Sequence, residues 1–177
     1  MTNSVFIATS LDGCIADKQG KLDWLNEIPN PDHNDAGYAA FMERMDAIVM
    51  GRNTYETVIG FDGEWPYRKP VFVLSRTLKS IPEKHQDNVE LLQGTPREII
   101  QTLHQKGHQN LYIDGGNTIQ NFLRDHLIDE MIITSIPILL GGGAKLFGDL
   151  AEPIKFELVK SNVLLNAMVQ NHYRKKS

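Results

Sequence analysis

The sequence of 177 residues predicts an α/β fold, a single domain (residues 1–177) with a central mixed, mostly parallel sheet flanked by helices and with antiparallel C-terminal edge strands. Three apolar, strand-like runs end in a turn of Gly, Arg, Ser or Thr, and a helix-like stretch soon follows. Strands that alternate with helices are typical of a parallel sheet. After residue 129 the chain is rich in β-branched residues without a convincing helix, which favours antiparallel strands at one edge.

Local patterns place the elements of the first half. The apolar run at residues 4–8 predicts a buried first strand, and a short apolar piece at 14–16 follows a turn. Within residues 35–45 the apolar side chains have helical spacing, so a helix is expected there. The apolar runs that precede the first two turns predict buried strands. We expect these strands at 46–50 and 71–74, with a short helix at 54–59 between them.

The second half begins with a well-marked helix. Pro96 suits the first turn of a helix and Gly107 a residue just beyond its end, so residues 96–106 are expected to be helical. Further apolar and β-branched runs predict the remaining strands. We expect these at 88–92, 111–114, 130–138, 156–159 and 163–173, with one more helix at 119–125.

Composition excludes several classes of function. The net charge of −4 disfavours a broad nucleic-acid-binding face. The chain has neither a membrane-length apolar run nor a signal-like start. Cys14 is the only cysteine, which excludes an internal disulfide and fits the cytoplasm. Because His104 and His108 have no evident third ligand, we expect no metal site.

The three turns carry groups that bind phosphates. The carboxyl ends of parallel strands meet at one edge of a sheet, where backbone N–H groups and helix N-termini hold anionic ligands. Arg52 and Arg76 add positive charge, Thr54 can cap the following helix, and Gly115 and Gly116 let the backbone approach a ligand closely. Three such turns indicate a long, multiply phosphorylated ligand, and a dinucleotide is the natural candidate.

Several short motifs occur in a fixed order along the chain. They are SLDG at residues 10–13 with IA at 15–16, MGRNTYE at 50–56, LSRT at 74–77, DGG at 114–116, and Pro137 followed by LGGG at 140–143 and LF at 146–147. Together they resemble the dihydrofolate reductase fold. They are most similar to the reductase (RibD C-terminal) domain of riboflavin biosynthesis and its stand-alone bacterial members. We expect such a stand-alone member, without the deaminase domain that often precedes the reductase.

The resemblance implies NADPH as the cofactor. It places the first turn at the pyrophosphate and the second around the adenosine 2′-phosphate. The third would contain a strained Gly–Gly link, cis in the family, and backbone groups near the first strand would hold the nicotinamide. The residues expected to bind the cofactor are Ala8, Ile15, Gly51, Arg52, Asn53, Thr54, Ser75, Arg76, Thr77, Gly115, Gly116, Asn117 and Thr118.

Reduction of a C=N group is easier when its nitrogen is protonated, and a carboxylic acid in an apolar pocket is a suitable donor. The resemblance places this acid on the helix after the Trp-bearing loop, where Asp35 stands. Asp12, in the turn after the first strand, is the second candidate catalytic residue. A helix-terminal acid and an Asx turn are the structural alternatives. Trp24, Tyr38 and Met42 are the expected substrate-binding residues.

An NADPH-dependent reductase of a C=N or C=O group in a small heterocyclic substrate is the activity that the resemblance implies. The substrate could be 5-amino-6-(5-phosphoribosylamino)uracil, as in the riboflavin pathway, or a dihydropterin or dihydrofolate. The alternative is a non-catalytic NADP(H)-binding sensor or scaffold, which needs no buried acid.

Two further expectations concern the last third of the chain. A homodimer is expected, because relatives pair through their late strands and residues 131–136 are typical of an apolar edge strand. The resemblance places the glycines at 141–143 near the cofactor or substrate edge, and a bend that connects two strands is the alternative.

Overall fold

The computed structural model describes residues 1–61 and 63–176. Its helices are α1 (Tyr38–Glu43), α2 (Arg52–Ile59), α3 (Pro96–Gln105) and α4 (Gly116–Arg124), with short 3-10 helices at Asp23–Asn26 and Glu83–His85. The main sheet consists of β1 (Thr2–Ser10), β3 (Ala47–Gly51), β4 (Val71–Leu74), β5 (Val89–Leu92), β6 (Asn110–Asp114), β7 (Glu130–Ile136), β9 (Phe156–Leu164) and β10 (Met168–Lys175). A small second sheet pairs β2 (Cys14–Ala16) with β8 (Ala144–Lys145).

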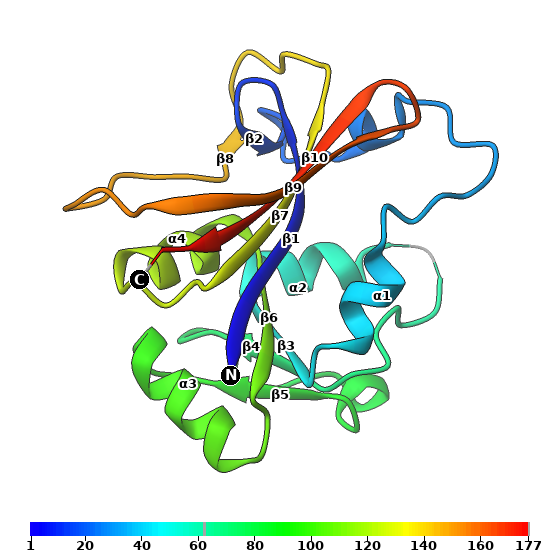
Figure 1. The fold of residues 1–177 in the computed structure, drawn as a ribbon. Helices are drawn as coiled ribbons and strands as arrows, with labels where there is room; N and C mark the ends of the chain where they lie inside the picture. Colours follow the sequence, from blue (N-terminus) through cyan, green and yellow to red (C-terminus); the bar gives the residue numbers. More distant parts are fainter. Residues whose placement is uncertain (62, 177) are drawn as a thin grey trace.

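The strand order of the main sheet is β5-β4-β3-β6-β1-β7-β10-β9 (Figure 1). The neighbours from β5 to β7 are parallel. Strand β10 is antiparallel to both β7 and β9. The expected α/β fold, with a mostly parallel sheet and an antiparallel C-terminal edge, is therefore confirmed.

Side chains of β3 alternate between two hydrophobic cores. Ala47 and Val49 belong to the core that includes residues of α3 and α4, whereas Ile48 and Met50 belong to the core that includes residues of α1 and α2. Figure 1 shows these two pairs of helices on opposite faces of the sheet. Burial of both faces explains why the parallel strands are continuous apolar runs. It also fixes their register, because a shift by one residue would exchange the two faces.

Three expected boundaries are wrong. Helix α1 is shorter than residues 35–45, since Gly37 has a φ of 83° and precedes its first turn, and α4 starts at Gly116 rather than at residue 119. The turn between the last two strands does not lie near residue 160. It lies at Leu165 and Asn166, whose φ values are 51° and 52°. The polar residues around position 160 belong instead to an exposed stretch of β9.

The expectation that residues 131–136 form an edge strand is also wrong. Strand β7 lies inside the sheet, between β1 and β10, and the two edges are β5 and β9. The apolar character of β7 therefore reflects burial in the sheet and not a free edge. Across residues 1–61 and 63–176, the structure has no helix with the length and apolarity that a membrane span requires.

Candidate active site

A groove with a cavity volume of about 940 Å³ runs along the carboxyl ends of β4, β3, β6 and β1. All thirteen residues that were expected to bind the cofactor line it. They are Ala8, Ile15, Gly51, Arg52, Asn53, Thr54, Ser75, Arg76, Thr77, Gly115, Gly116, Asn117 and Thr118. The three turns that are far apart in the sequence are thus brought to one continuous surface, because their strands are neighbours in a parallel sheet.

Two helices begin at this groove without a side-chain cap. Gly51 precedes α2 and Gly115 precedes α4, and neither helix has a cap hydrogen bond from a side chain. Helix α3 differs, since Thr95 forms a reciprocal capping box with its first turn. The first N–H groups of a helix have no partner within the helix. Helices α2 and α4 therefore present such groups to the groove, and the expectation that Thr54 caps α2 is wrong because Thr54 lies in its first turn.

The glycines at this site allow the two helix starts to touch. A Cβ atom on Gly51 would lie 2.9 Å from Oγ1 of Thr118, and one on Gly115 would overlap Oγ1 of Thr54. Gly115 also has a φ of 89°, which disfavours other residues. The expected cis link at 115–116 is not found, since none of the peptide bonds in the described chain is cis. The close approach results from the missing side chains instead.

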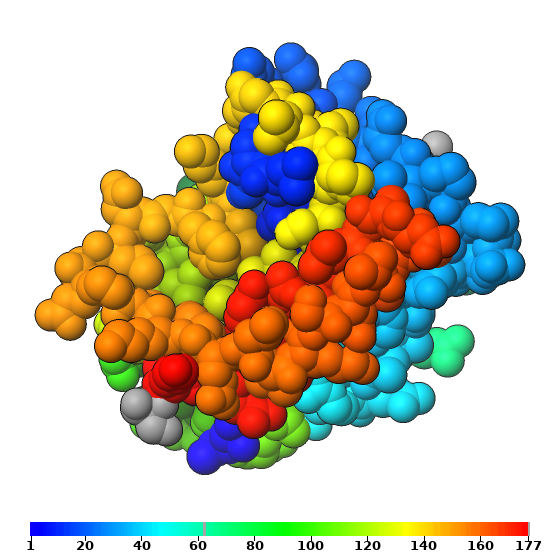
Figure 2. Space-filling view, turned by 45° about the horizontal axis from the view of Figure 1, so that its top comes forward, coloured from blue at the N-terminus to red at the C-terminus, as the bar shows by residue number. Residues whose placement is uncertain are grey.

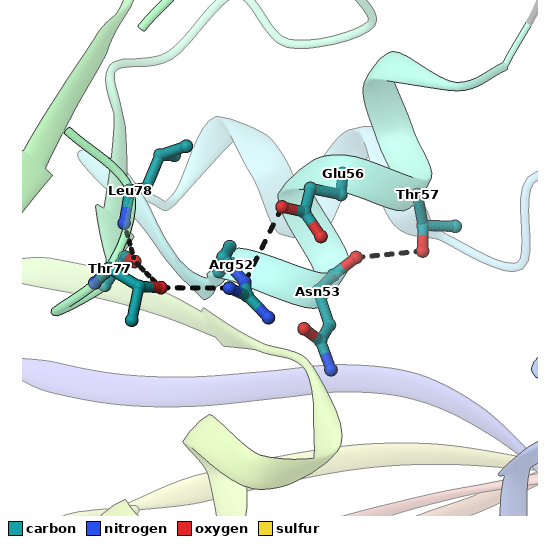
Figure 3. A network of polar contacts seen from close by, with 7 residues as sticks. Arg52, Asn53, Glu56, Thr57, Thr77 and Leu78 are labelled. Carbon is teal, nitrogen blue, oxygen red and sulfur yellow. Dashed lines mark hydrogen bonds and ion pairs between the residues drawn. The ribbon is translucent and has the colours of Figure 1, made fainter. Parts of the chain in front are cut away.

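The first and second turns are joined by polar contacts that centre on Arg52 (Figure 3). Its guanidinium donates to Oγ1 of Thr77 at 2.9 Å, and its Nε lies 3.6 Å from the Glu56 carboxylate. The hydroxyl of Ser75 accepts from the N–H of Leu78 at 2.9 Å. A cation at the first position of a helix is unfavourable unless an anion lies nearby, and the Glu56 carboxylate is one such anion. The arrangement thus holds Arg52 at the place where an anionic ligand would meet the start of α2.

The structure reveals one ionisable residue that the sequence analysis did not single out. Asp114 ends β6, lines the groove and accepts a hydrogen bond from the N–H of Gly115 at 2.8 Å. Burial raises the pKa of its carboxyl to about 6, against the lowering effect of that bond. Burial raises the pKa of Tyr38 to about 12, and the charge of Asp114 is the second cause. The same two causes raise the pKa of Tyr67 by more. A carboxyl that is partly protonated near neutral pH therefore faces the cavity.

Asp12 and Asp35 are in different surroundings. Asp12 accepts hydrogen bonds from the Ser10 hydroxyl and from the N–H groups of Leu140 and Gly141, and these contacts, that of Ser10 first, lower its pKa to about 2. Asp35 accepts from two N–H groups at the start of α1, which lowers its pKa. Neither residue lines the groove. Both are stable carboxylates that hold loops, and this argues against either as a proton donor.

The hydrogen bond from the N–H of Gly141 to Asp12 holds the glycine-rich segment at 141–143 against the turn after β1. In Figure 2 the yellow atoms of this region surround the dark blue turn near the N-terminus. A Cβ atom on Gly143 would overlap the carbonyl oxygen of Ala16. These glycines form a close-packed connection against β2, and the cavity is lined by the next two residues, Ala144 and Lys145.

None of the three expected substrate-binding residues lines the groove. Trp24 is buried, whereas its neighbours Leu22 and Leu25 line the cavity. Tyr38 packs against the ring of Phe6, and Met42 packs against the core beneath α1 and α2. The sequence identified the right loop but not which of its side chains face the cavity. Within the described residues, no group of three or more His, Cys, Asp or Glu side chains could hold a metal ion.

Comparison with known proteins matches residues 4–170 to the RibD C-terminal domain model. The uncharacterized protein YwjB of Bacillus subtilis (strain 168) is 36% identical over 172 residues, which cover 96% of this chain and 95% of that protein. A Shewanella sp. PV-4 protein provisionally assigned to riboflavin biosynthesis is 56% identical, with both chains fully covered and a TM-score of 0.98.

A dihydrofolate reductase of Enterococcus faecalis, in complex with NADP(H) and a second ligand, is similar in structure with a TM-score of 0.69. The two chains are 19% identical, and the match covers 99% of this chain and 97% of the reductase. At this identity the similarity shows the fold alone. It confirms the expected dihydrofolate reductase-like architecture.

Proposed function

The chain belongs to the RibD C-terminal domain family, and from this we propose that it is an NADPH-dependent reductase of a C=N or C=O group in a small heterocyclic substrate. The observation that carries the proposal is the pair of uncapped helix N-termini at Gly51 and Gly115, which meet at one groove. Two adjacent sets of N–H groups suit the two phosphates of a dinucleotide. Membership in a reductase family supports the same reading.

The cofactor is NADPH, and the residues that line the groove suit the separate parts of this molecule. Ser75, Arg76 and Thr77 lie at the adenosine end, where Arg76 has no ion-pair partner among the described residues. A guanidinium beside two hydroxyls suits a terminal phosphate. Ala8 and Ile15 lie at the opposite end, formed by β1 and β2. When bound, NADPH supplies the hydride.

We assign the part of the groove with apolar walls to the substrate. We call it the substrate end and define it by Leu22, Leu25, Val58, Phe61, Tyr67 and Asp114, which all line the cavity. In this proposal Asp114 holds the proton that the acceptor atom receives. Its raised pKa keeps part of the carboxyl protonated near neutral pH, which is what general acid catalysis requires. Asp12 and Asp35 then serve the fold.

Calorimetry with NADPH and NADH, followed by NADPH oxidation assays, tests this function. We expect saturable binding of NADPH, weaker binding of NADH, and turnover with either a ribosylaminouracil or a dihydropterin. Binding without turnover of either substrate class would favour the non-catalytic sensor or scaffold. Failure to bind NADPH would contradict both readings.

We also propose a homodimer that forms through the β9 edge. Strand β9 exposes Leu158, Val159 and Val163, and the exposed Val169 of β10 pairs with Val163. In Figure 2 the orange to red atoms of the C-terminal part of the chain lie across one face of the molecule. An apolar edge strand is a common site of association. Light scattering should report twice the mass of the chain, and Val163→Lys should reduce it to the mass of one chain. A single-chain mass for the unmodified protein would contradict the dimer.

A further inference from the structure

We propose that the substrate is a phosphate-free, planar heterocycle that presents an N–H group to Asp114. This inference rests on the proposed function and narrows the substrate class of the same site. It separates the options that the family resemblance leaves open, because 5-amino-6-(5-phosphoribosylamino)uracil carries a phosphate and a dihydropterin need not.

The walls of the substrate end suit a flat, uncharged ring. Leu22 and Leu25 come from the loop after β2, and Val58 and Phe61 come from the end of α2 and the residues that follow it. The Phe61 side chain is 57% exposed although it lines the groove. Stacking a ring against Phe61 would therefore remove apolar surface from water.

The polar groups at this end are hydrogen-bonding groups of neutral or negative character. Asp114 offers carboxylate oxygens, and Tyr67 offers a phenol that stays protonated because burial raises its pKa. A ring N–H or amino group can donate to an Asp114 oxygen in either protonation state, whereas a phosphate would be repelled by the ionised form, which predominates above pH ~6. Placing a like charge in a partly desolvated site without a counter-ion is costly.

The cations that line the groove are at other places. Among the described lining residues they are Arg52, Arg76 and Lys145. Arg52 begins α2 and points to Thr77, while Val58 lies near the far end of the same helix. The carbonyl of Lys145 accepts a hydrogen bond from Gln120 of α4, which places this residue beside α4. Lys145 also pairs with Cys14 of β2, next to Ile15. Among the described residues that line the cavity, the three cations thus lie at the second turn and beside α4 and β2, and none belongs to the substrate end as defined above.

Two matched pairs of ligands test the inference. The first pair is 5-amino-6-ribosylaminouracil and its 5′-phosphate, and the second is 7,8-dihydroneopterin and its monophosphate. Each is titrated calorimetrically into the full chain, with and without saturating NADP⁺. We expect the phosphate-free member of at least one pair to bind, and to bind at least about threefold tighter than its phosphorylated partner. Equal or tighter binding of the phosphorylated member, or no binding of all four, would overturn the inference.

A charge introduced at the substrate end provides a second test. Val58→Arg should increase the affinity for the phosphorylated ligands about tenfold or more, whereas Val58→Met adds volume without charge and should not. No gain with Val58→Arg would show that charge at this end does not exclude phosphate, and would overturn the inference. Titration with NADP⁺ alone separates this failure from failure of the proposed function, since the latter predicts NADP⁺ binding whatever the substrate pairs show.

Discussion

Replacement of Asp114 by Asn should stabilise the protein, with an effect that depends on pH. Asn keeps the shape of the side chain and an oxygen that accepts from the N–H of Gly115. The carboxyl has a pKa of about 6 in the folded protein, compared with the ordinary value of 3.8. The folded state therefore binds this proton more tightly than the unfolded state does. The stabilisation that the protonated Asp114 carboxyl gives the fold is complete below pH ~4 and is lost as the pH rises through about 6.

The expected magnitude follows from this difference in pKa. Each unit of difference in pKa between the folded and unfolded states corresponds to about 1.4 kcal/mol, so ionisation of Asp114 costs the folded state about 3 kcal/mol above pH ~7. Asn does not ionise and avoids this cost. The free energy of unfolding of Asp114→Asn should thus exceed that of the unmodified protein by up to about 3 kcal/mol at pH ~8, and the difference should shrink toward pH ~4.

Urea unfolding at pH ~4, ~6 and ~8, followed by tryptophan fluorescence, measures this difference. Asp87→Asn controls for loss of an exposed carboxylate outside the groove. A gain that does not grow with pH, or a loss of stability at pH ~8, would refute the assigned ionisation. In the same variant, turnover should fall at least about tenfold while NADPH affinity is retained, since removal of a positioned acid typically costs ~10²–10⁴ in rate. Stability gained at the expense of activity is typical of functional sites.

The remaining predictions concern the cofactor turns and the Asp12 contact. Arg76→Ala should weaken NADPH binding about 10- to 100-fold, since a charge-assisted hydrogen bond contributes ~1.5–3 kcal/mol, and it should weaken NADH binding much less. Calorimetry measures both affinities, with Arg174→Ala as the control variant. Equal losses for the two cofactors would show that Arg76 does not bind the 2′-phosphate. Gly115→Ala should destabilise the fold by about 1–3 kcal/mol because its Cβ overlaps Thr54, and Thr54→Ala should restore part of this loss in urea unfolding. No restoration would assign the cost to the backbone at φ 89° alone. Asp12→Asn should lower the free energy of unfolding at neutral pH. Because the pKa of Asp12 is lowered to about 2 in the folded protein, its carboxylate stabilises the fold at neutral pH, and this stabilisation is lost as the pH falls through about 2. A difference between the variant and the unmodified protein that persists in urea unfolding at pH ~2 would contradict this.

The parallel part of the sheet could be predicted because each strand is buried on both faces. Ala47 to Met50 fill two cores in alternation, which leaves a continuous apolar signal in the sequence. The three turns follow directly from these strand ends, so the groove was accessible to the same reasoning. The turn at Leu165 and Asn166 was not, because an exposed edge strand such as β9 has no strong apolar pattern and its polar residues look like a turn.

The acidic residues show where sequence reasoning fails. Asp114 was seen only as the residue before two glycines, and its raised pKa depends on burial by segments that are distant in the chain. Asp12 looked like a candidate acid, but its partners include backbone groups at residues 140 and 141. A useful signal was present for Asp114, since a carboxylate that ends an apolar parallel strand lies at the ligand-binding edge. The ionisation of a carboxyl is set by tertiary neighbours, which spacing does not reveal.

The position of β1 has a consequence for how the chain reaches its final form. Residues 2–10 are the first of the sheet to leave the ribosome, yet they pair in parallel with β6 and β7, whose residues lie between 110 and 136. The amino-terminal strand therefore stays unpaired with β6 and β7 until most of the polypeptide has been synthesised. Such long-range pairing slows folding. Before it pairs, this apolar segment is exposed and suits chaperones that bind nascent chains.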